Sequence, residues 1–333
     1  MEFKEFKEEV KPLRKFLLIL IGIVVGTIII SIIFTSIRQA SFNKVKVKEY
    51  NILVTTQIGY DFAKKILDEE DDVNLLTRDK DVFGETYEVT PKNLREIRKA
   101  DVIIYCGDEA EPWLKKVLED KIKNTDKILI NMCAEMNVLR YYESDNLINN
   151  LDYGETSLYN IPVKEKDEGK RSYTFWTNPN NAMAILDKLY ENLSALSSQH
   201  VETYYENYIN YKDKLSKVIE NYEELKKRID DEIMLCCFRD ISPYFIQDLN
   251  IKYMNIFDND KKIFEENKAL LNYYIEKVVT SYVIYSDREN KEIVENIVDK
   301  EKLFVIDDMT THNQEFSYID LMSENILAMK KAY

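Results

Sequence analysis

Short apolar runs rich in Ile, Val, Tyr and Phe recur along this chain, with segments of helical character between them. Apolar runs of this length are typical of strands that are buried on both faces. Strands that alternate with helices form parallel sheets covered by helices. The sequence therefore predicts an α/β fold with parallel sheets. The clearest runs are Tyr50–Thr55, Val102–Tyr105, Ile128–Met132, Ile233–Phe238, Ile251–Phe257, Val278–Ser286 and Leu303–Ile306.

Two helix starts are marked by their capping residues. Thr90 precedes Pro91, and Asn178 precedes Pro179. Thr and Asn side chains accept hydrogen bonds from the first free N–H groups of a helix, and proline fits the first helical position because that position needs no donor. We expect helices to begin at Pro91 and at Pro179.

A long helix is predicted between the two series of strands, over residues 200–230. Residues 143–173 are polar and irregular, and we expect them to form an exposed excursion. The long helix would join an N-terminal α/β lobe (50–199) to a C-terminal α/β lobe (231–333). Its apolar residues recur at helical spacing and are interpreted as a packing stripe. They are Tyr204, Tyr208, Tyr211, Leu215, Val218, Tyr222 and Leu225.

The N-terminal region contains an uncharged run over residues 16–37, dominated by Ile, Leu and Val. An apolar helix of roughly 20 residues is long enough to cross a bilayer. A cleaved signal would need a shorter run and a small-residue cleavage site, which the sequence after Ser31 lacks. We therefore expect an uncleaved transmembrane anchor at 16–37, a cytoplasmic head at 1–15 and a linker at 38–49.

The charge of the chain limits its partners. The basic residues of the short head favour an inside N-terminus, so that the soluble domain would be extracytoplasmic at the cell membrane. The net charge is −14 for the whole chain and +2 for residues 1–38, which leaves −16 for the rest. A surface so acidic disfavours nucleic acid and anionic lipid as partners.

Several kinds of chemistry are missing from the sequence. It contains no nucleophile elbow, phosphate-binding loop or dinucleotide fingerprint. His200 and His312 are the only histidines, so a site with several histidines is excluded. We expect His200 to lie at the surface, and His312 to lie in a loop, where it is either solvated or near a cleft. We predict that the protein is not an enzyme.

The four cysteines also lack the paired spacing of metal ligands. Each lies in or beside an apolar run, where a cysteine packs as a small hydrophobic side chain. They are Cys106, Cys133, Cys236 and Cys237.

Polar residues follow many of the predicted strands. In open parallel sheets, ligands bind beyond the carboxyl ends of the strands. The polar strand ends therefore predict a cleft between the two lobes. The segments concerned are Thr55-Thr56-Gln57, Cys106-Gly107-Asp108-Glu109, Cys133-Ala134-Glu135, Arg239-Asp240, Asp287-Arg288 and Asp307-Asp308.

Seven short segments stand out in a fixed order over about residues 50–330. They are Tyr87-Glu88-Val89-Thr90-Pro91-Lys92, Ala100-Asp101-Val102-Ile103-Ile104-Tyr105, Glu111-Pro112-Trp113-Leu114, Phe175-Trp176-Thr177-Asn178-Pro179-Asn180-Asn181-Ala182, Tyr204-Tyr205-Glu206-Asn207, Arg239-Asp240-Ile241-Ser242-Pro243-Tyr244-Phe245 and Tyr318-Ile319-Asp320-Leu321-Met322. Each segment is short, but together and in this order they are specific. The set resembles the zinc/manganese-type solute-binding proteins of ABC transporters.

The resemblance implies two α/β lobes joined by a backbone helix, with a divalent cation, zinc or manganese, held in the cleft and passed to an ABC permease. The family supplies three histidines and one carboxylate to that cation. The matching positions here are Glu85, Thr174 and Arg239 for the histidines and Asp307 for the carboxylate. The carboxylate is retained and every histidine is replaced. Further cleft candidates are Asp240, Asp287, Asp308 and His312.

Three interpretations of this altered site remain open. A guanidinium cannot ligate a metal, so Arg239 could take the cation's electrostatic place by pairing with Glu85 and Asp307 across a closed lobe interface. Arg239 could instead recognise an anionic or zwitterionic ligand or a protein partner, with Thr174 as a donor. Finally, Glu85, Asp240, Asp287 and Asp307 could form an oxygen site suited to manganese or calcium.

Overall fold

The computed structural model describes residues 20–33, 50–77, 81–122, 126–140, 171–197, 199–229, 234–237, 242–255, 282–285, 302–310 and 317–333. The chain divides into two compact units, residues 1–48 and residues 49–333. In the first unit, residues 20–33 are helical and their side chains are mostly exposed. Among the described residues, no helix is both long and apolar enough to cross a membrane. The predicted anchor, residues 16–37, extends beyond the described helix at residues 20–33 at both ends.

A first four-stranded parallel sheet has the order β2-β1-β3-β4. β3 has the predicted bounds, whereas β1 and β4 are shorter than the apolar runs that predicted them. β2 was not predicted, because three strand residues with Asn74 at the centre give no detectable pattern. The strands are β1 (Ile52–Val54), β2 (Val73–Leu75), β3 (Val102–Tyr105) and β4 (Ile128–Asn131).

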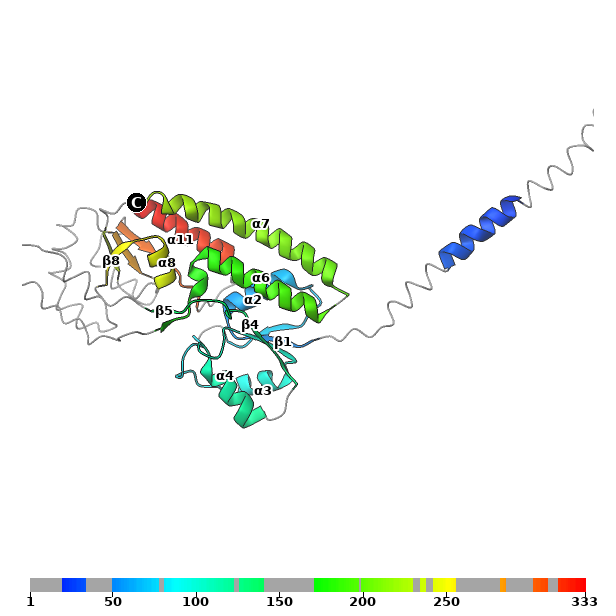
Figure 1. Ribbon diagram of the computed structural model, residues 1–333, viewed down its shortest axis with the longest axis horizontal. Coiled ribbons are helices and arrows are strands. Elements are labelled where there is room, and N and C mark those ends of the chain that lie inside the picture. Colours follow the sequence, from blue (N-terminus) through cyan, green and yellow to red (C-terminus); the bar gives the residue numbers. More distant parts are fainter. Residues whose placement is uncertain are drawn as a thin grey trace, which may run out of the picture. The chain divides into compact units, whose positions relative to one another are not determined.

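Helices cover both faces of the first sheet (Figure 1). On one face lie α3 (Pro91–Lys99) and α4 (Pro112–Val117), which continues as a π-helical turn at Leu118–Ile122; on the other lie α2 (Gln57–Ile66) and α6 (Pro179–Leu196). Alternate strand residues enter two separate cores, Leu53 and Ile103 toward α3 and α4, and Val54 and Ile104 toward α2 and α6. This alternation confirms burial on both faces for β1 and β3, the two central strands, whereas β2 and β4 each have an exposed residue.

The predicted helix starts are confirmed. The Thr90 hydroxyl accepts a hydrogen bond from the Asn93 N–H at 3.1 Å, and the Asn93 side chain accepts one from the Thr90 N–H at 3.1 Å, which forms a reciprocal capping box. The Asn178 side chain caps α6 by accepting from the Asn180 N–H at 2.9 Å. Proline follows each cap, as the sequence requires.

A second four-stranded parallel sheet has the order β10-β9-β7-β8. Its strands are β7 (Met234–Cys237), β8 (Lys252–Asn255), β9 (Tyr282–Tyr285) and β10 (Leu303–Val305). The remaining elements are α8 (Pro243–Asp248), α11 (Tyr318–Ala332), the 3₁₀ turn η2 (Phe175–Thr177) and the antiparallel pair β5 (Leu139–Arg140) and β6 (Arg171–Ser172). The two parallel sheets confirm the predicted α/β class. We call residues 50–197 the first lobe and residues 234–333 the second lobe.

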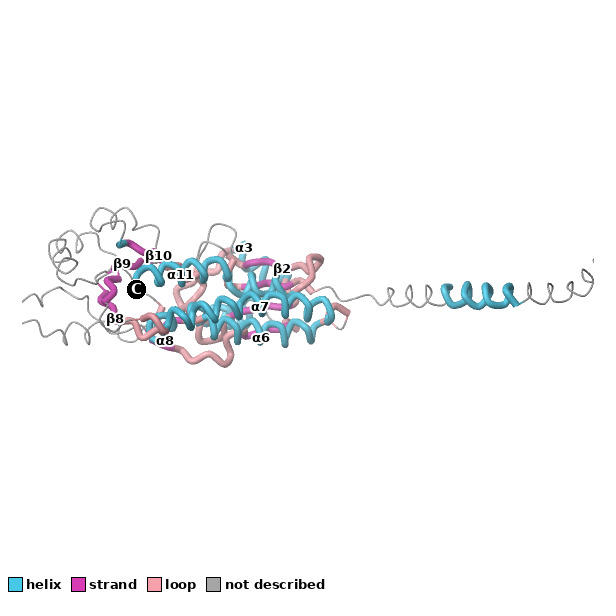
Figure 2. Tube along the Cα trace, turned by 90° about the horizontal axis from the view of Figure 1, so that it is seen from above, coloured by secondary structure: helices cyan, strands magenta, loops and turns pink. Residues whose placement is uncertain are grey.

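The long helix α7 (Val201–Lys226) lies between the two sheets in sequence and runs beside α6 (Figure 2). All seven residues of its predicted stripe are buried, which confirms that the tyrosines serve packing. Asp61 on α2 accepts hydrogen bonds from the Tyr211 hydroxyl at 2.8 Å and from the Tyr318 N–H of α11 at 3.3 Å. One buried carboxylate therefore ties the first lobe and the last helix to α7.

Candidate functional site

Thr174, at one of the positions where the resemblance implies a histidine, is buried in a network of hydroxyl groups. Its hydroxyl donates to the Ser242 hydroxyl at 2.7 Å and lies 2.9 Å from the Ser172 hydroxyl. Thr177 completes the network beside Ser242. All four side chains are at most 5% exposed. Ser242 belongs to the second lobe, so the hydroxyl of Thr174 is used in a direct bond between the lobes.

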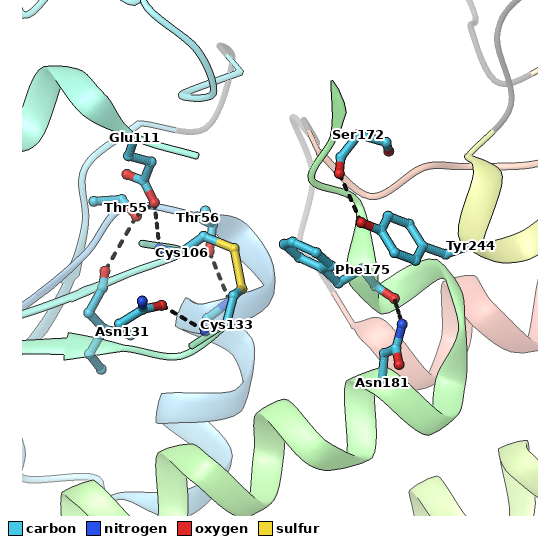
Figure 3. Close-up of a disulfide and its surroundings, with 12 residues drawn as sticks. Thr55, Thr56, Cys106, Glu111, Asn131, Cys133, Ser172, Phe175, Asn181 and Tyr244 are labelled. Atoms are coloured by element: carbon cyan, nitrogen blue, oxygen red, sulfur yellow. Dashed lines mark hydrogen bonds between the residues drawn. A yellow bond between two sulfur atoms is a disulfide. The ribbon is translucent and has the colours of Figure 1, made fainter. Parts of the chain in front are cut away.

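Tyr244 on α8 makes a second connection to the first lobe. Its hydroxyl accepts from the Leu139 N–H at 2.8 Å and lies 3.0 Å from the carbonyl oxygens of Asn137 and Ser172. Its ring packs against Phe175, with centroids 5.0 Å apart. Figure 3 shows Tyr244 directed at the segment that carries Ser172 and Phe175.

Trp176 brings three loops together. Its indole N–H donates to the Asp308 carbonyl at 2.9 Å, and its own carbonyl accepts from the Tyr318 hydroxyl at 2.7 Å. The ring of Phe83 lies 5.8 Å from that of Trp176 and 5.7 Å from that of Tyr173. The loops after β2 and β10 therefore meet the segment around Thr174 through aromatic packing and backbone hydrogen bonds.

Asp307 follows β10, as predicted, and its backbone is held firmly. The buried Asn325 side chain accepts from the Asp307 N–H at 2.8 Å and donates to the Asp307 carbonyl at 2.8 Å. The Asp307 carboxylate accepts from the Met309 N–H at 2.7 Å, and Met309 adopts a left-handed backbone conformation (φ 61°). The neighbouring Asp308 carboxylate accepts from the N–H and hydroxyl of Thr310. Asp307 is thus oriented and partly accessible to solvent, whereas Asp308 stabilises its own turn.

Glu85 makes none of the hydrogen bonds of this network among the described residues. It is exposed and lines a pocket of the first lobe together with residues of α4, and neither Thr174 nor Asp307 lines that pocket. The aromatic Phe83, two residues earlier, makes the contact with Trp176 instead. Arg239, Asp240, Asp287 and His312 lie outside the described residues. Within the described part of the chain, no group of three or more His, Cys, Asp or Glu side chains is arranged to hold a metal.

Glu111 is a buried carboxyl group at the carboxyl end of β3. Its side chain is 0% exposed, and Oε1 accepts from the Cys106 N–H at 2.6 Å and from the Thr55 hydroxyl at 3.0 Å. Its second oxygen, Oε2, is buried without a hydrogen-bond partner among the described residues. Burial raises the pKa of Glu111 to about 8, against the lowering effect of these two hydrogen bonds, and the charge of Asp81 raises it further. Glu111 is therefore mostly protonated at neutral pH.

The cysteine interpretation needs a correction. Cys106 and Cys133 are buried, as expected, but they form a disulfide between the ends of β3 and β4, with Cα atoms 4.9 Å apart (Figure 3). The two strands are adjacent in the sheet, which brings residues 27 positions apart within bonding distance. Spacing along the sequence did not reveal this pair, although both cysteines directly follow predicted strands, and that position was the available signal.

His200 lies at the start of α7, where its ring stacks on Tyr204 and its Nδ1 is 3.7 Å from the Asp68 carboxylate. Its side chain is 30% exposed. The expectation of a surface residue is met only in part, since the ring is half-covered by its neighbours.

Comparison with known proteins gives a consistent result. The family model described as ZnuA, a periplasmic component A of a zinc-uptake complex, matches residues 52–332. The zinc-binding lipoprotein AdcA of Streptococcus pneumoniae is 23% identical over 291 residues, which cover 84% of this chain and 55% of AdcA. The chain thus spans about half the length of the curated relatives it matches.

Solved structures share the fold. The Zn(II)-bound ZnuA-like domain of S. pneumoniae AdcA has a TM-score of 0.64 at 19% identity, covering 85% of this chain and 98% of that domain. The metal-dependent lipoprotein YcdH of Bacillus subtilis also has a TM-score of 0.64, at 16% identity, covering 84% of this chain and 98% of YcdH. At these identities the similarity establishes the architecture alone.

Proposed function

Because the chain belongs to the ZnuA family, we propose that it is the extracytoplasmic solute-binding protein of a metal-uptake ABC transporter. Its cargo would be a divalent cation, zinc or manganese, delivered to an ABC permease. The protein would bind and release the cation without catalysing a reaction. The family match over residues 52–332 carries this proposal, since it covers both sheets and the helix between them.

The cation site would differ from the family's. Asp307 has the properties of a ligand, because Asn325 and Met309 fix its position while it stays partly accessible. Thr174 does not fit a ligand role, since its hydroxyl is buried and bonded to Ser242. Carboxylate, carbonyl and water oxygens suit manganese, whereas imidazole nitrogens suit zinc. We propose a cation site built around Asp307 with oxygen donors, weaker for zinc than a site with three histidines.

We further propose that residues 16–37 anchor the protein in the cell membrane as a single span, with residues 1–15 inside and the domain outside. The support is the uncharged apolar run between Lys15 and Arg38, of which residues 20–33 are helical. The anchor would keep the domain close to its permease. Flotation of the full chain with neutral vesicles at high salt checks this proposal, and a chain that stays unbound contradicts it.

Calorimetric titration of the full chain with zinc and with manganese tests the cation site. We expect saturable binding that Asp307→Asn weakens at least tenfold, because the variant removes the charge of a ligand. Asp213→Asn is the matched control, since Asp213 is exposed on α7, far along the chain from the site. Binding that Asp307→Asn leaves unchanged would remove Asp307 from the site. The absence of saturable binding with both metals would reject the cation function.

A further inference from the structure

A single peptide group in the loop after β10, the one that joins Asp308 to Met309, is held on both sides. Its N–H belongs to Met309 and donates to the Asp307 carboxylate at 2.7 Å. Its carbonyl belongs to Asp308 and accepts from the Trp176 indole N–H at 2.9 Å. A peptide group is planar and trans, so that its N–H and its carbonyl point in opposite directions. A donor that fixes this carbonyl therefore also aims the N–H at the carboxylate.

The conformation of Met309 shows that this peptide group is constrained. Its backbone is left-handed (φ 61°) and its side chain is 0% exposed. A residue other than glycine keeps such a conformation only where the surrounding structure enforces it, and these residues are concentrated at active sites and ligand clamps. The hydrogen bonds to Trp176 and Asp307 contribute to that enforcement. They also form a chain in which each hydrogen bond polarises and strengthens the next.

Helix α11 fixes both ends of this chain of hydrogen bonds. The Tyr318 hydroxyl donates to the Trp176 carbonyl at 2.7 Å, and the Asn325 side chain binds the N–H and the carbonyl of Asp307, each at 2.8 Å. Tyr318 and Asn325 lie about two helical turns apart, so that they share one face of α11. Both are buried, at 0% and 3% exposure. One helix face therefore sets the position of the indole relative to the carboxylate.

The chain of hydrogen bonds also crosses between the lobes, since Trp176 belongs to the first lobe and Asp307 to the second. Trp176 is only 1% exposed, and the ring of Phe83 lies 5.8 Å from its ring. An indole packed in this way cannot follow a moving loop without disturbing its neighbours. The first lobe thus acts on the orientation of the Asp307 carboxylate without supplying a ligand itself.

We propose that Trp176 is a positioning residue of the cation site, which orients the Asp307 carboxylate by holding the Asp308–Met309 peptide group. This inference rests on the proposed cation function and identifies how the first lobe controls a site in the second. Groups that orient a metal ligand from behind tune its affinity, and their loss typically weakens metal binding roughly 10–100-fold. Trp176 has this role without contacting the cation.

Calorimetric titration of the full chain with zinc and with manganese tests the proposal on Trp176→Phe. Phenylalanine keeps an aromatic ring in the core but has no N–H to donate, so that we expect roughly tenfold weaker binding. Trp113→Phe is the matched control, because Trp113 is also a buried indole of the first lobe, whose N–H donates to the Val82 carbonyl at 2.7 Å instead. It should lose stability in the same way and change the cation affinity by less than about twofold.

A double-mutant cycle separates positioning from a general loss of structure. The neutral side chain of Asp307→Asn is a weak cation ligand, so that little affinity remains for its orientation to change. In that background Trp176→Phe should weaken binding by about twofold or less. Equal weakening by Trp176→Phe in both backgrounds would overturn the role of Trp176. Equal weakening by Trp113→Phe and Trp176→Phe would also overturn it.

The emission of Trp176 gives a second measurement, which does not require Trp176→Phe to fold. Trp113 and Trp176 are the only tryptophans, so that Trp113→Phe leaves Trp176 as the sole source of emission. Zinc has a filled d shell and no redox chemistry, so that an emission change on zinc binding reflects the surroundings of the indole. We expect a change that follows the calorimetric curve and that Asp307→Asn abolishes. Constant emission through a zinc titration that saturates by calorimetry would overturn the coupling.

The outcomes distinguish this role of Trp176 from the function on which it rests. A full chain that binds neither cation rejects the cation function and the role of Trp176 with it. Binding that Asp307→Asn weakens, and that both tryptophan variants leave unchanged, rejects the role of Trp176 alone.

Discussion

Glu111 and Asp307 both follow a strand of a parallel sheet, yet the structure gives them opposite environments. Glu111 is fully buried beside β3, has one oxygen without a partner among the described residues, and is mostly protonated near neutral pH. Asp307 after β10 is partly accessible and is oriented by Asn325 and Met309. A carboxylate at a strand end is therefore a ligand candidate only if the fold leaves it open to solvent. A carboxyl group that the fold buries, as it does Glu111, is part of the core instead.

The largest expected effect is the change with pH in the free energy of unfolding that Glu111 causes. Its folded pKa of about 8 exceeds the ordinary value of 4.5, so the folded state holds this proton more tightly than the unfolded state. The stabilisation is complete below about pH 4.5, declines as pH rises, and is lost above about pH 8, a change of roughly 4–5 kcal/mol. Urea unfolding from pH 5 to pH 9 measures it.

Glu111→Gln is neutral at every pH and should remove most of this decline. Glu119→Gln, an exposed change nearby in the chain, should leave the decline as it is in the wild type. A decline that persists in Glu111→Gln would show that the buried carboxyl group is not its source.

The disulfide should give the next largest effect. Replacing Cys106 and Cys133 together with serine frees a loop of 27 residues, which should lower the free energy of unfolding by about 3–4 kcal/mol. Chemical denaturation with and without a reductant measures the loss. Reductant should have no effect on the double variant, and an effect there would point to Cys236 or Cys237.

Tyr244→Phe tests the connection between the lobes. The change removes a hydroxyl that contacts three backbone groups of the first lobe and leaves the Leu139 N–H without its partner. We expect a loss of about 2 kcal/mol. Tyr205→Phe is the control, since Tyr205 is 52% exposed and should shift stability by less than about 0.5 kcal/mol. Equal losses in the two variants would argue against an energetic role for the Tyr244 hydroxyl.

The smallest effect on stability is expected for Asp307→Asn. The asparagine side-chain oxygen can still accept a hydrogen bond from the Met309 N–H. The free energy of unfolding should therefore change by less than about 1 kcal/mol. Cation binding, in contrast, should fall. Asp307→Asn should therefore affect cation binding more than stability, whereas the effect expected at Glu111 concerns stability. A large loss of stability in Asp307→Asn would place Asp307 with Glu111 as a structural carboxylate.

A polar residue that follows a strand does not by itself indicate a cleft between the lobes. The sequence correctly indicated that polar residues follow the strands, but it treated Thr55, Thr56 and Gln57 as cleft candidates, and all three are at most 6% exposed. Glu85 was grouped with Thr174 and Asp307 by resemblance, and in the structure it lines a pocket whose lining includes neither of them. Arg239 and its acidic neighbours lie outside the described residues, so that their part in the site stays a prediction.

The sequence by itself determined the local features of this protein. The apolar runs predicted the parallel sheets, Thr90 and Asn178 marked their helices, and the seven-residue stripe of α7 was recognised from its spacing. These features depend on residues that are close to one another along the chain, so that the sequence shows them directly.

Only the tertiary structure decided the remaining features. The bond of Thr174 to Ser242 joins positions 68 residues apart, and Cys106 and Cys133 are separated by 27. The burial of Glu111 likewise depends on how neighbouring strands pair and which helices cover them. Such contacts are set by packing between distant segments, and burial in turn sets whether a carboxyl group is charged. For that reason the structure leaves Asp307, a ligand candidate from the sequence, partly accessible to solvent, whereas it places the carboxyl group of Glu111 in the core.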